Sequence, residues 1–112
     1  MQIEYKNDKV LKECTHHKTM AKIFPPEIVK ALQNLLSILE AIENLSAFVT
    51  TPVLLPYALE KLKGDRQYQM SLRVKPNKQY RLIFKCLNTD IKDDYKNMTH
   101  IMIIEVSKHY SK

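Results

Sequence analysis

The chain has 112 residues, of which 45% are hydrophobic and 27% are charged, and it carries a formal net charge of +6 at pH 7. This length and composition are typical of one soluble globular domain, so we expect a single domain over residues 1–112 and neither a disordered nor a membrane-embedded chain. The single glycine, Gly64, excludes phosphate-binding loops, dinucleotide-binding loops and serine-hydrolase elbows, which all need several glycines.

The cysteines and the first residues favour a reducing compartment. Cys14 and Cys86 lie 72 positions apart and are too few for a disulfide framework or a four-thiolate zinc site. The opening MQIEYKNDKV has no apolar run typical of a signal peptide, and no stretch of the sequence approaches the roughly 18 apolar residues of a membrane span. We therefore expect a cytoplasmic protein that does not bind a membrane.

The first residues of the chain predict a short strand and a short helix. Gln2–Tyr5 alternates as an edge strand does. Asn7 or Asp8 can then cap a helix over about residues 9–18. A metal site at His16 and His17, near Cys14, is not expected, because adjacent histidines on a helix point in different directions and no fourth ligand lies in range.

A longer helix is predicted to begin at the sequence PPE, residues 25–27, because proline is tolerated in the first turn and a glutamate suits its positive end. Apolar residues then recur at steps of three and four and form one stripe that faces a core. A coiled-coil dimer is the competing interpretation, but the stripe covers fewer than three heptads. Residues 45–56, with two prolines, predict a connector with a short helical turn. The stripe consists of Ile28, Val29, Leu32, Leu35, Leu36, Leu39 and Ile42.

The second half of the chain predicts strands. A hairpin over Met70–Cys86 that turns at residues 76–78 pairs Val74 with Tyr80, Leu72 with Leu82 and Met70 with Phe84 on one apolar face. A last strand over 101–104, apolar at every position, is expected to be covered on both faces and to end at 105–106. The whole pattern predicts an α+β fold, with two N-terminal helices packed on one face of a small antiparallel sheet. The polar face of the hairpin carries Ser71, Arg73, Lys75, Gln79, Arg81, Ile83 and Lys85.

The excess positive charge is concentrated in one segment. Residues 61–85 contain eight basic residues and one acid, while the rest of the chain carries a net charge of −1. Such a segment favours a polyanion such as nucleic acid, and a solvated basic face is the alternative. Arg73 lies directly opposite Arg81 in the predicted hairpin, an arrangement that destabilises a sheet unless an anion is held between them. The alternative is that the two side chains fan apart into water.

Four motifs recur in a known order and spacing: LKGDR at 62–66, SLRV at 71–74, QYRLIF at 79–84 and IIEVSKHY at 103–110. With the opening YKNDKVLKEC at 5–14, they resemble the HigB-type killer toxins of the RelE/ParE superfamily over nearly the whole chain. The resemblance implies the α+β fold of that superfamily and the toxin of a type II toxin-antitoxin system, which cleaves mRNA on the ribosome, inhibits translation and needs no metal or other cofactor. It also implies a HigA-like helix-turn-helix antitoxin, through which operator DNA is contacted only indirectly.

The resemblance also implies positions for the site. Lys63 follows the leucine of the LKG motif, Arg73 is the arginine of the S-x-R strand, and Arg81 is the arginine of QYR. The C-terminal catalytic pair falls on His109 and Tyr110, in reversed order.

Metal-free RNA cleavage uses the ribose 2′-hydroxyl as nucleophile, so the protein supplies proton transfer and stabilises negative charge on the phosphoryl oxygens. The permanently charged, fork-shaped guanidinium groups suit the second role, which we assign to Arg73 and Arg81.

The proton-transfer roles leave alternatives open. Lys63 is a candidate base, and Glu60, which stands where many relatives carry a histidine, is its rival. His109 is the natural acid for the leaving oxygen, because a histidine titrates near neutrality. Tyr110 is an alternative acid or a platform for base stacking. The other basic residues of the segment are expected to bind RNA: Lys61, Arg66, Lys75, Lys78 and Lys85.

Two other functions share the same resemblance. A ParE-like toxin would have the same fold but would inhibit a DNA topoisomerase without cleaving RNA. A degenerate toxin would only bind its antitoxin, and the glutamate at Glu60 is the feature that favours it. The His-Tyr tail and the opposed arginines favour the nuclease, because a binding-only protein needs no acid at the end of a strand.

Overall fold

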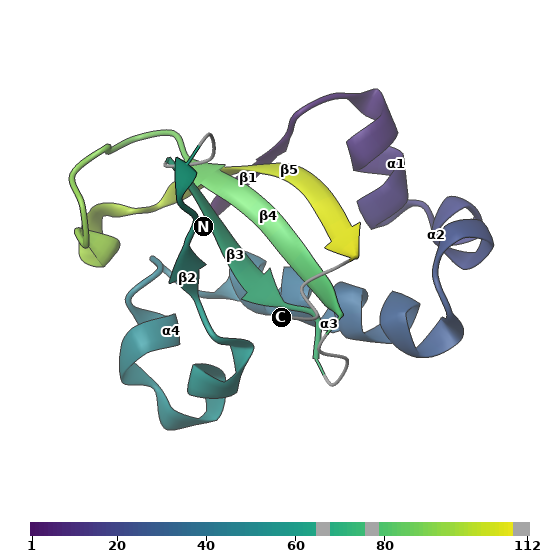
Figure 1. Ribbon diagram of the computed structural model, residues 1–112, viewed down its shortest axis with the longest axis horizontal. Helices are drawn as coiled ribbons and strands as arrows, with labels where there is room; N and C mark the ends of the chain where they lie inside the picture. Colours follow the sequence, from purple (N-terminus) through teal and green to yellow (C-terminus); the bar gives the residue numbers. More distant parts are fainter. Residues whose placement is uncertain (65–67, 76–78, 109–112) are drawn as a thin grey trace.

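The arrangement of the chain is shown in Figure 1, a computed structural model that describes residues 1–64, 68–75 and 79–108. Five strands form one sheet in the order β1-β5-β4-β3-β2. This mixture of helices and one sheet confirms the predicted α+β class. The elements are β1 (Gln2–Tyr5), α1 (Asp8–Thr15), α2 (His17–Ile23), α3 (Pro26–Ala41), α4 (Ala47–Thr50), the 3-10 helix η1 (Pro52–Tyr57), β2 (Glu60–Lys61), β3 (Gln69–Arg73), β4 (Tyr80–Cys86), the 3-10 helix η3 (Tyr95–Asn97) and β5 (His100–Lys108).

The hairpin of β3 and β4 has the predicted register. Met70 pairs with Phe84, Leu72 pairs with Leu82, and the backbone N–H of Val74 donates to the carbonyl of Tyr80 at 3.0 Å. All six of these apolar side chains are buried. The alternation of apolar and polar residues therefore fixed both the pairing and the face turned to the core.

The two ends of the sheet differ from the expectation. β1 is an edge strand, but it pairs in parallel with β5, so the sheet is not wholly antiparallel. β5 is longer than predicted and runs to Lys108. The expectation that it is covered on both faces is wrong, because Ile101 and Ile103 are fully buried whereas Met102 and Ile104 are only partly buried.

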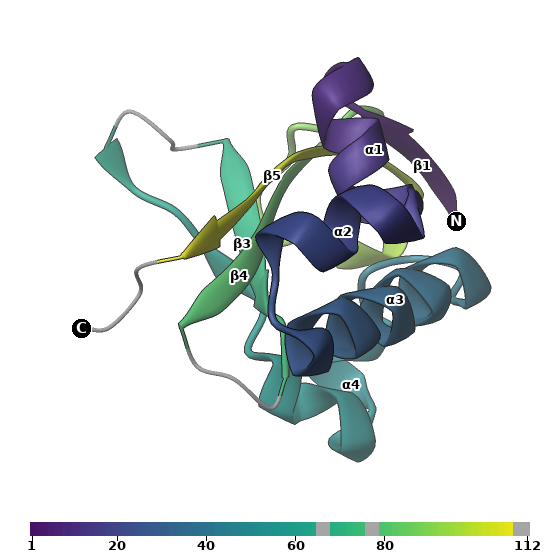
Figure 2. The same ribbon diagram turned by 90° about the vertical axis from the view of Figure 1, so that its right-hand side faces the viewer.

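The helices lie on one side of the sheet, as Figure 2 shows for α1, α2 and α3. α3 begins at Pro26 as expected, and its predicted apolar stripe faces the core. The last residue of the stripe, Ile42, lies just past the helix end and is partly buried.

The first helix, α1, is capped by Asn7, whose Oδ1 accepts a hydrogen bond from the N–H of Val10 at 2.9 Å. The single helix predicted over 9–18 is wrong, because the chain is extended at His16, with φ −101° and ψ 108°, and restarts as α2. Three helices, not two, therefore precede the connector.

The connector over 45–56 forms α4 and η1, in agreement with the predicted helical turn. Leu45 and Phe48 are buried in the core, and the Phe48 ring meets the Tyr57 ring edge to face at 5.8 Å between centroids. η1 ends at Ala58, which has a left-handed backbone with φ 50°. The connector thus ends at the start of β2, beside the polar face of the hairpin.

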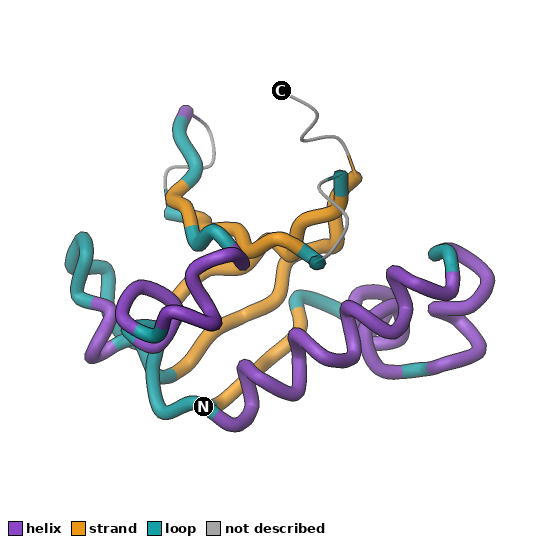
Figure 3. Tube along the Cα trace, turned by 90° about the horizontal axis from the view of Figure 1, so that it is seen from below, coloured by secondary structure: helices purple, strands orange, loops and turns teal. Residues whose placement is uncertain are grey.

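The sheet has two faces, one that packs toward α3 and one that is turned away from it. Figure 3, seen from below, shows the last residues of β5 rising on this side of the sheet. The described helices include none long and apolar enough to cross a membrane.

Candidate functional site

The polar side chains of β2, β3, β4 and β5 share the sheet face away from α3. Side chains alternate across a strand, and the core-facing residues of the hairpin are already assigned, so the residues between them face the other way. Strand pairing aligns Arg73 with Arg81 and Ser107, and aligns Glu60 with Ser71. We call this surface the arginine face; it is formed by Glu60, Ser71, Arg73, Arg81, Ile83, Lys85, Glu105 and Ser107.

Arg81 is the most constrained residue of the arginine face. Its side chain is only 5% exposed. Its Nε donates to Ser71 Oγ at 2.8 Å, and its Nη2 donates to the carbonyl oxygen of Ala58 at 2.7 Å. The same Nη2 lies 3.7 Å from Glu60 Oε2. The alternative in which this arginine fans out into water is therefore wrong.

Arg73 differs from its partner in exposure. Its Cα is paired with that of Arg81, yet Arg73 is only partly buried. Two neighbours on the same face, Ser71 and Ile83, are fully buried. The arginine face is therefore closed around Arg81 and more open at Arg73, so the two guanidinium groups have different access to a ligand.

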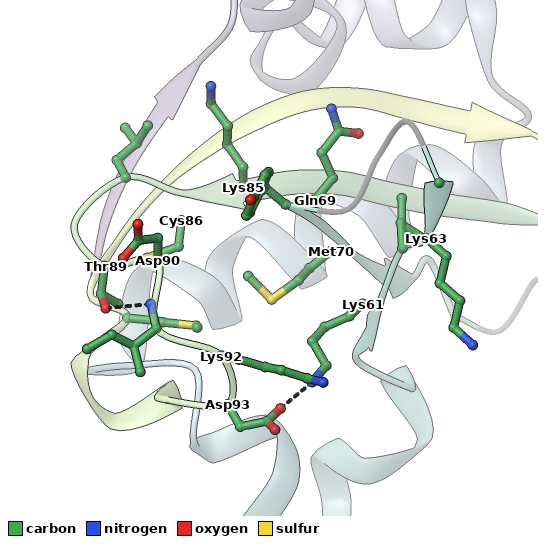
Figure 4. A pocket seen from close by; sticks show the side chains of 16 residues that line it. Lys61, Lys63, Gln69, Met70, Lys85, Cys86, Thr89, Asp90, Lys92 and Asp93 are labelled. Atoms are coloured by element: carbon green, nitrogen blue, oxygen red, sulfur yellow. Dashed lines mark hydrogen bonds and ion pairs between the residues drawn. The ribbon is translucent and has the colours of Figure 1, made fainter.

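Three lysines of the basic segment line a cavity at the end of the β3–β4 hairpin away from Arg73 and Arg81. The cavity has a volume of ≈ 780 Å³, and both Lys61 and Lys63 line it. Lys61 forms an ion pair with Asp93 from the loop between β4 and β5 (Figure 4). In the same view the side chain of Lys85, a residue that also lines the cavity, points away from Met70, in keeping with its place on the arginine face.

The ion pair between Lys61 and Asp93 shifts the pKa of both side chains. The hydrogen bond from Lys61 is the main cause that lowers the pKa of Asp93 from its ordinary value of 3.8, and the same bond raises the pKa of Lys61 above 10.5. Because the folded-state pKa of Asp93 is depressed, the stability it contributes is present above pH 3.8 and is lost as the pH falls through the lowered pKa. Both groups are exposed, so the effect on stability is small.

We expect Lys61→Ala to return the Asp93 carboxyl titration toward 3.8, as measured by NMR of the side-chain carboxyl carbon. Lys92→Ala is the matched control, because Lys92 makes a smaller contribution to the same shift. An unchanged titration in Lys61→Ala would contradict the ion pair.

Lys75 makes a separate contact. Its Nζ lies 5.1 Å from the centre of the Tyr57 ring, an arrangement typical of a cation–π interaction. Tyr57 in turn accepts a hydrogen bond from Asn34 Nδ2 at 3.2 Å. Lys75 thus contacts η1, and its predicted contact with RNA stays a prediction.

Four predicted site residues lie outside the described residues: Arg66, Lys78, His109 and Tyr110. The described part of β5 ends at Lys108, whose Nζ lies 5.8 Å from the centre of the Tyr80 ring. Of the predicted catalytic residues, the structure therefore brings together Glu60, Arg81 and Arg73, and it places Lys63 at the cavity.

Three contributors to these sites were missed by the sequence reasoning. Ser71 was placed on the correct face, and its position two residues before Arg73 could have indicated a contact with a diagonal neighbour. Ala58 and Asp93 act through tertiary contacts with residues 23 and 32 positions away. Their sequence neighbourhoods contain no signal for those contacts.

Within residues 1–64, 68–75 and 79–108, no group of three or more His, Cys, Asp and Glu could hold a metal ion. Cys14 is buried, and burial is the main cause that raises its thiol pKa to about 12, so the thiol stays protonated at neutral pH.

Comparisons with known proteins place this geometry in context. Among solved structures, the chain is similar to the YoeB/ParE toxin from Agrobacterium tumefaciens, at 18% identity over 98% of this chain and 100% of that chain, with a TM-score of 0.51. It is similar to the YoeB–YefM complex from Staphylococcus aureus, at 21% identity over 98% of each chain, with a TM-score of 0.52. It is also similar to the DinJ–YafQ complex from E. coli, at 18% identity over 96% of this chain and 92% of that chain, with a TM-score of 0.54.

These likenesses concern the fold. A comparison with the curated proteins finds no match. The sequence matches the family model of the RelE-like toxin of type II toxin-antitoxin system HigB over residues 4–100. The match ends at the first residue of β5, so it includes every residue of the arginine face except Glu105 and Ser107. The chain therefore belongs to the family of RelE-like HigB toxins of type II toxin-antitoxin systems.

Proposed function

We propose that this toxin cleaves mRNA on the ribosome and that a helix-turn-helix antitoxin of the HigA type neutralises it. Membership of the HigB family supports a role as toxin. Two of the similar structures are complexes, YoeB with YefM and DinJ with YafQ, which supports a protein partner for this chain. The observation that carries the nuclease proposal is the placement of Arg73 and Arg81 at paired positions on the arginine face.

Two opposed arginines are unfavourable for folding alone. Like charges at directly opposite positions destabilise a sheet, and burying one of them adds a cost of desolvation. A phosphate bound at Arg73 would offset the repulsion, and the buried charge of Arg81 would act on it with little screening by water. Arg81 is already held by partners in the protein, including Glu60 Oε2 at 3.7 Å, so the position that an anionic ligand would explain is that of Arg73.

The proposed reaction needs only groups of this chain and the RNA. Glu60, the candidate base on the arginine face, takes the proton of the 2′-hydroxyl, and O2′ forms a bond to the adjacent phosphorus. Lys63, the other candidate base, lines the cavity and not the arginine face. The bond from phosphorus to the 5′-oxygen breaks, and an acid, His109 or Tyr110, gives that oxygen a proton. The products are a 2′,3′-cyclic phosphate and a 5′-hydroxyl. Arg73 and Arg81 stabilise the extra negative charge on the phosphoryl oxygens.

The test is cleavage of ribosome-bound mRNA by the purified chain in the Mg²⁺ that the ribosome itself needs, followed by mapping of the new ends. We expect discrete cuts with 5′-hydroxyl and 2′,3′-cyclic phosphate ends, and no cut where the nucleotide before the cleavage site is 2′-deoxy. Cuts with 5′-phosphate ends, or cuts that persist at a 2′-deoxy nucleotide, would overturn the proposed reaction. Growth arrest in cells with intact transcripts would overturn the nuclease and favour a ParE-like role, whereas the absence of both arrest and cuts would favour a chain that only binds its antitoxin.

A further inference from the structure

The guanidinium group of Arg81 is held along one edge. Nε and Nη2 belong to the same edge of the planar group, and both donate to protein oxygens, at 2.8 Å to Ser71 Oγ and at 2.7 Å to the Ala58 carbonyl. That edge is therefore not available to grip a phosphate with two parallel hydrogen bonds. Through this edge Arg81 binds the fold rather than a ligand.

The two acceptors come from separate parts of the fold. Ser71 is in the middle of β3 and is fully buried. Ala58 follows η1, and its left-handed backbone, with φ 50°, is uncommon for a residue other than glycine. A strand and a connector thus hold one side chain from two directions. Since a free arginine side chain has many rotamers, two fixed acceptors restrict it strongly.

We propose that Ser71 is a positioning residue for RNA cleavage, which acts by fixing the guanidinium of Arg81 below the phosphate held by Arg73. This inference rests on the proposed nuclease function. Electrostatic catalysis is most effective when charges are already oriented before the reaction, because no reorganisation is then needed in the transition state. Ser71 and the Ala58 carbonyl together orient the Arg81 guanidinium. The carboxylate of Glu60 lies 3.7 Å from Nη2 of the same guanidinium.

The first test is single-turnover and steady-state cleavage of ribosome-bound mRNA by Ser71→Ala. We expect kcat to fall by about 10- to 100-fold with KM changed less than about threefold, because the lost hydrogen bond involves a charged donor and affects the transition state more than binding. Ser71→Thr keeps the hydroxyl and should retain most of the activity. Ser37→Ala, at an exposed position of α3, is the matched control and should match the parent.

The second test separates positioning from a merely structural role. Arg81→Lys removes the Nε donor, so Ser71→Ala should cause no further loss of kcat in that background if Ser71 acts through Arg81. Losses that multiply in the double variant would overturn the proposal, as would a kcat of Ser71→Ala within twofold of the parent. If Ser71→Ala fails to fold, Ser71→Cys keeps the volume, removes the strong acceptor and should show the same loss. A parent chain that cuts no RNA would overturn the proposed function itself, and this inference with it.

Discussion

Replacing Arg73 with alanine should reduce cleavage of ribosome-bound mRNA by roughly 100- to 1000-fold, the usual effect of removing one preorganised donor from a developing negative charge. Arg73 is the more open of the two paired arginines, so it has the better access to a phosphate. The measurement is the single-turnover rate with the purified chain. The loss should appear mainly in kcat, because the charge on the phosphoryl oxygens increases in the transition state.

A matched control removes a cation from the opposite side of the molecule. Lys30 is exposed on α3, which packs against the other face of the sheet, and Lys30→Ala should cleave at the parental rate. A parental rate of cleavage by Arg73→Ala would show that Arg73 has no role in the reaction. Equal losses in both variants would indicate a general effect of net charge on binding to the ribosome.

Replacing Arg81 with alanine should destabilise the folded chain by about 3 kcal/mol or more, because it leaves a cavity and removes the donor from Ser71 Oγ and from the Ala58 carbonyl. For a chain of this length that loss corresponds to a decrease in the melting temperature of roughly 10 °C or more. Thermal unfolding followed by circular dichroism measures it directly. Cleavage should also fall sharply at temperatures at which the variant is still folded.

Arg73→Ala serves as the stability control for this variant. Its side chain is partly exposed, and its removal relieves the like-charge opposition to Arg81, so the melting temperature should stay within a few degrees of the parent. A similar melting temperature for Arg81→Ala and the parent would contradict the structural role of the buried guanidinium.

Much of the fold could be predicted because its signals are local. The 3.6-residue stripe of α3 and the alternation around the hairpin each specify one element and one buried face, and both are observed. The break at His16 and the parallel pairing of β1 with β5 could not be predicted in the same way. Each depends on contacts with elements elsewhere in the chain, and no glycine or proline marks either place.

The candidate site was predictable only in part. The predicted register correctly paired Arg73 with Arg81. The burial of Arg81 could not be predicted, because it depends on a hydrogen bond to the carbonyl of Ala58, which lies after the connector. The concentration of positive charge between residues 61 and 85 does not determine where each side chain points. Lys61 pairs with Asp93, and Lys75 lies over Tyr57. The described basic side chains therefore make contacts in different parts of the molecule and do not converge on one point.

The central claim is that a scissile phosphate of mRNA binds at Arg73, beside the fixed charge of Arg81. The most direct measurement is a structure of this chain on a ribosome whose mRNA carries a 2′-deoxy nucleotide at the cleavage site, so that the nucleophile is missing and the complex is stable. We expect the phosphate within hydrogen-bond distance of the Arg73 guanidinium, on the arginine face. A phosphate bound instead at the cavity lined by Lys61 and Lys63, or an mRNA that does not contact the arginine face, would contradict the claim.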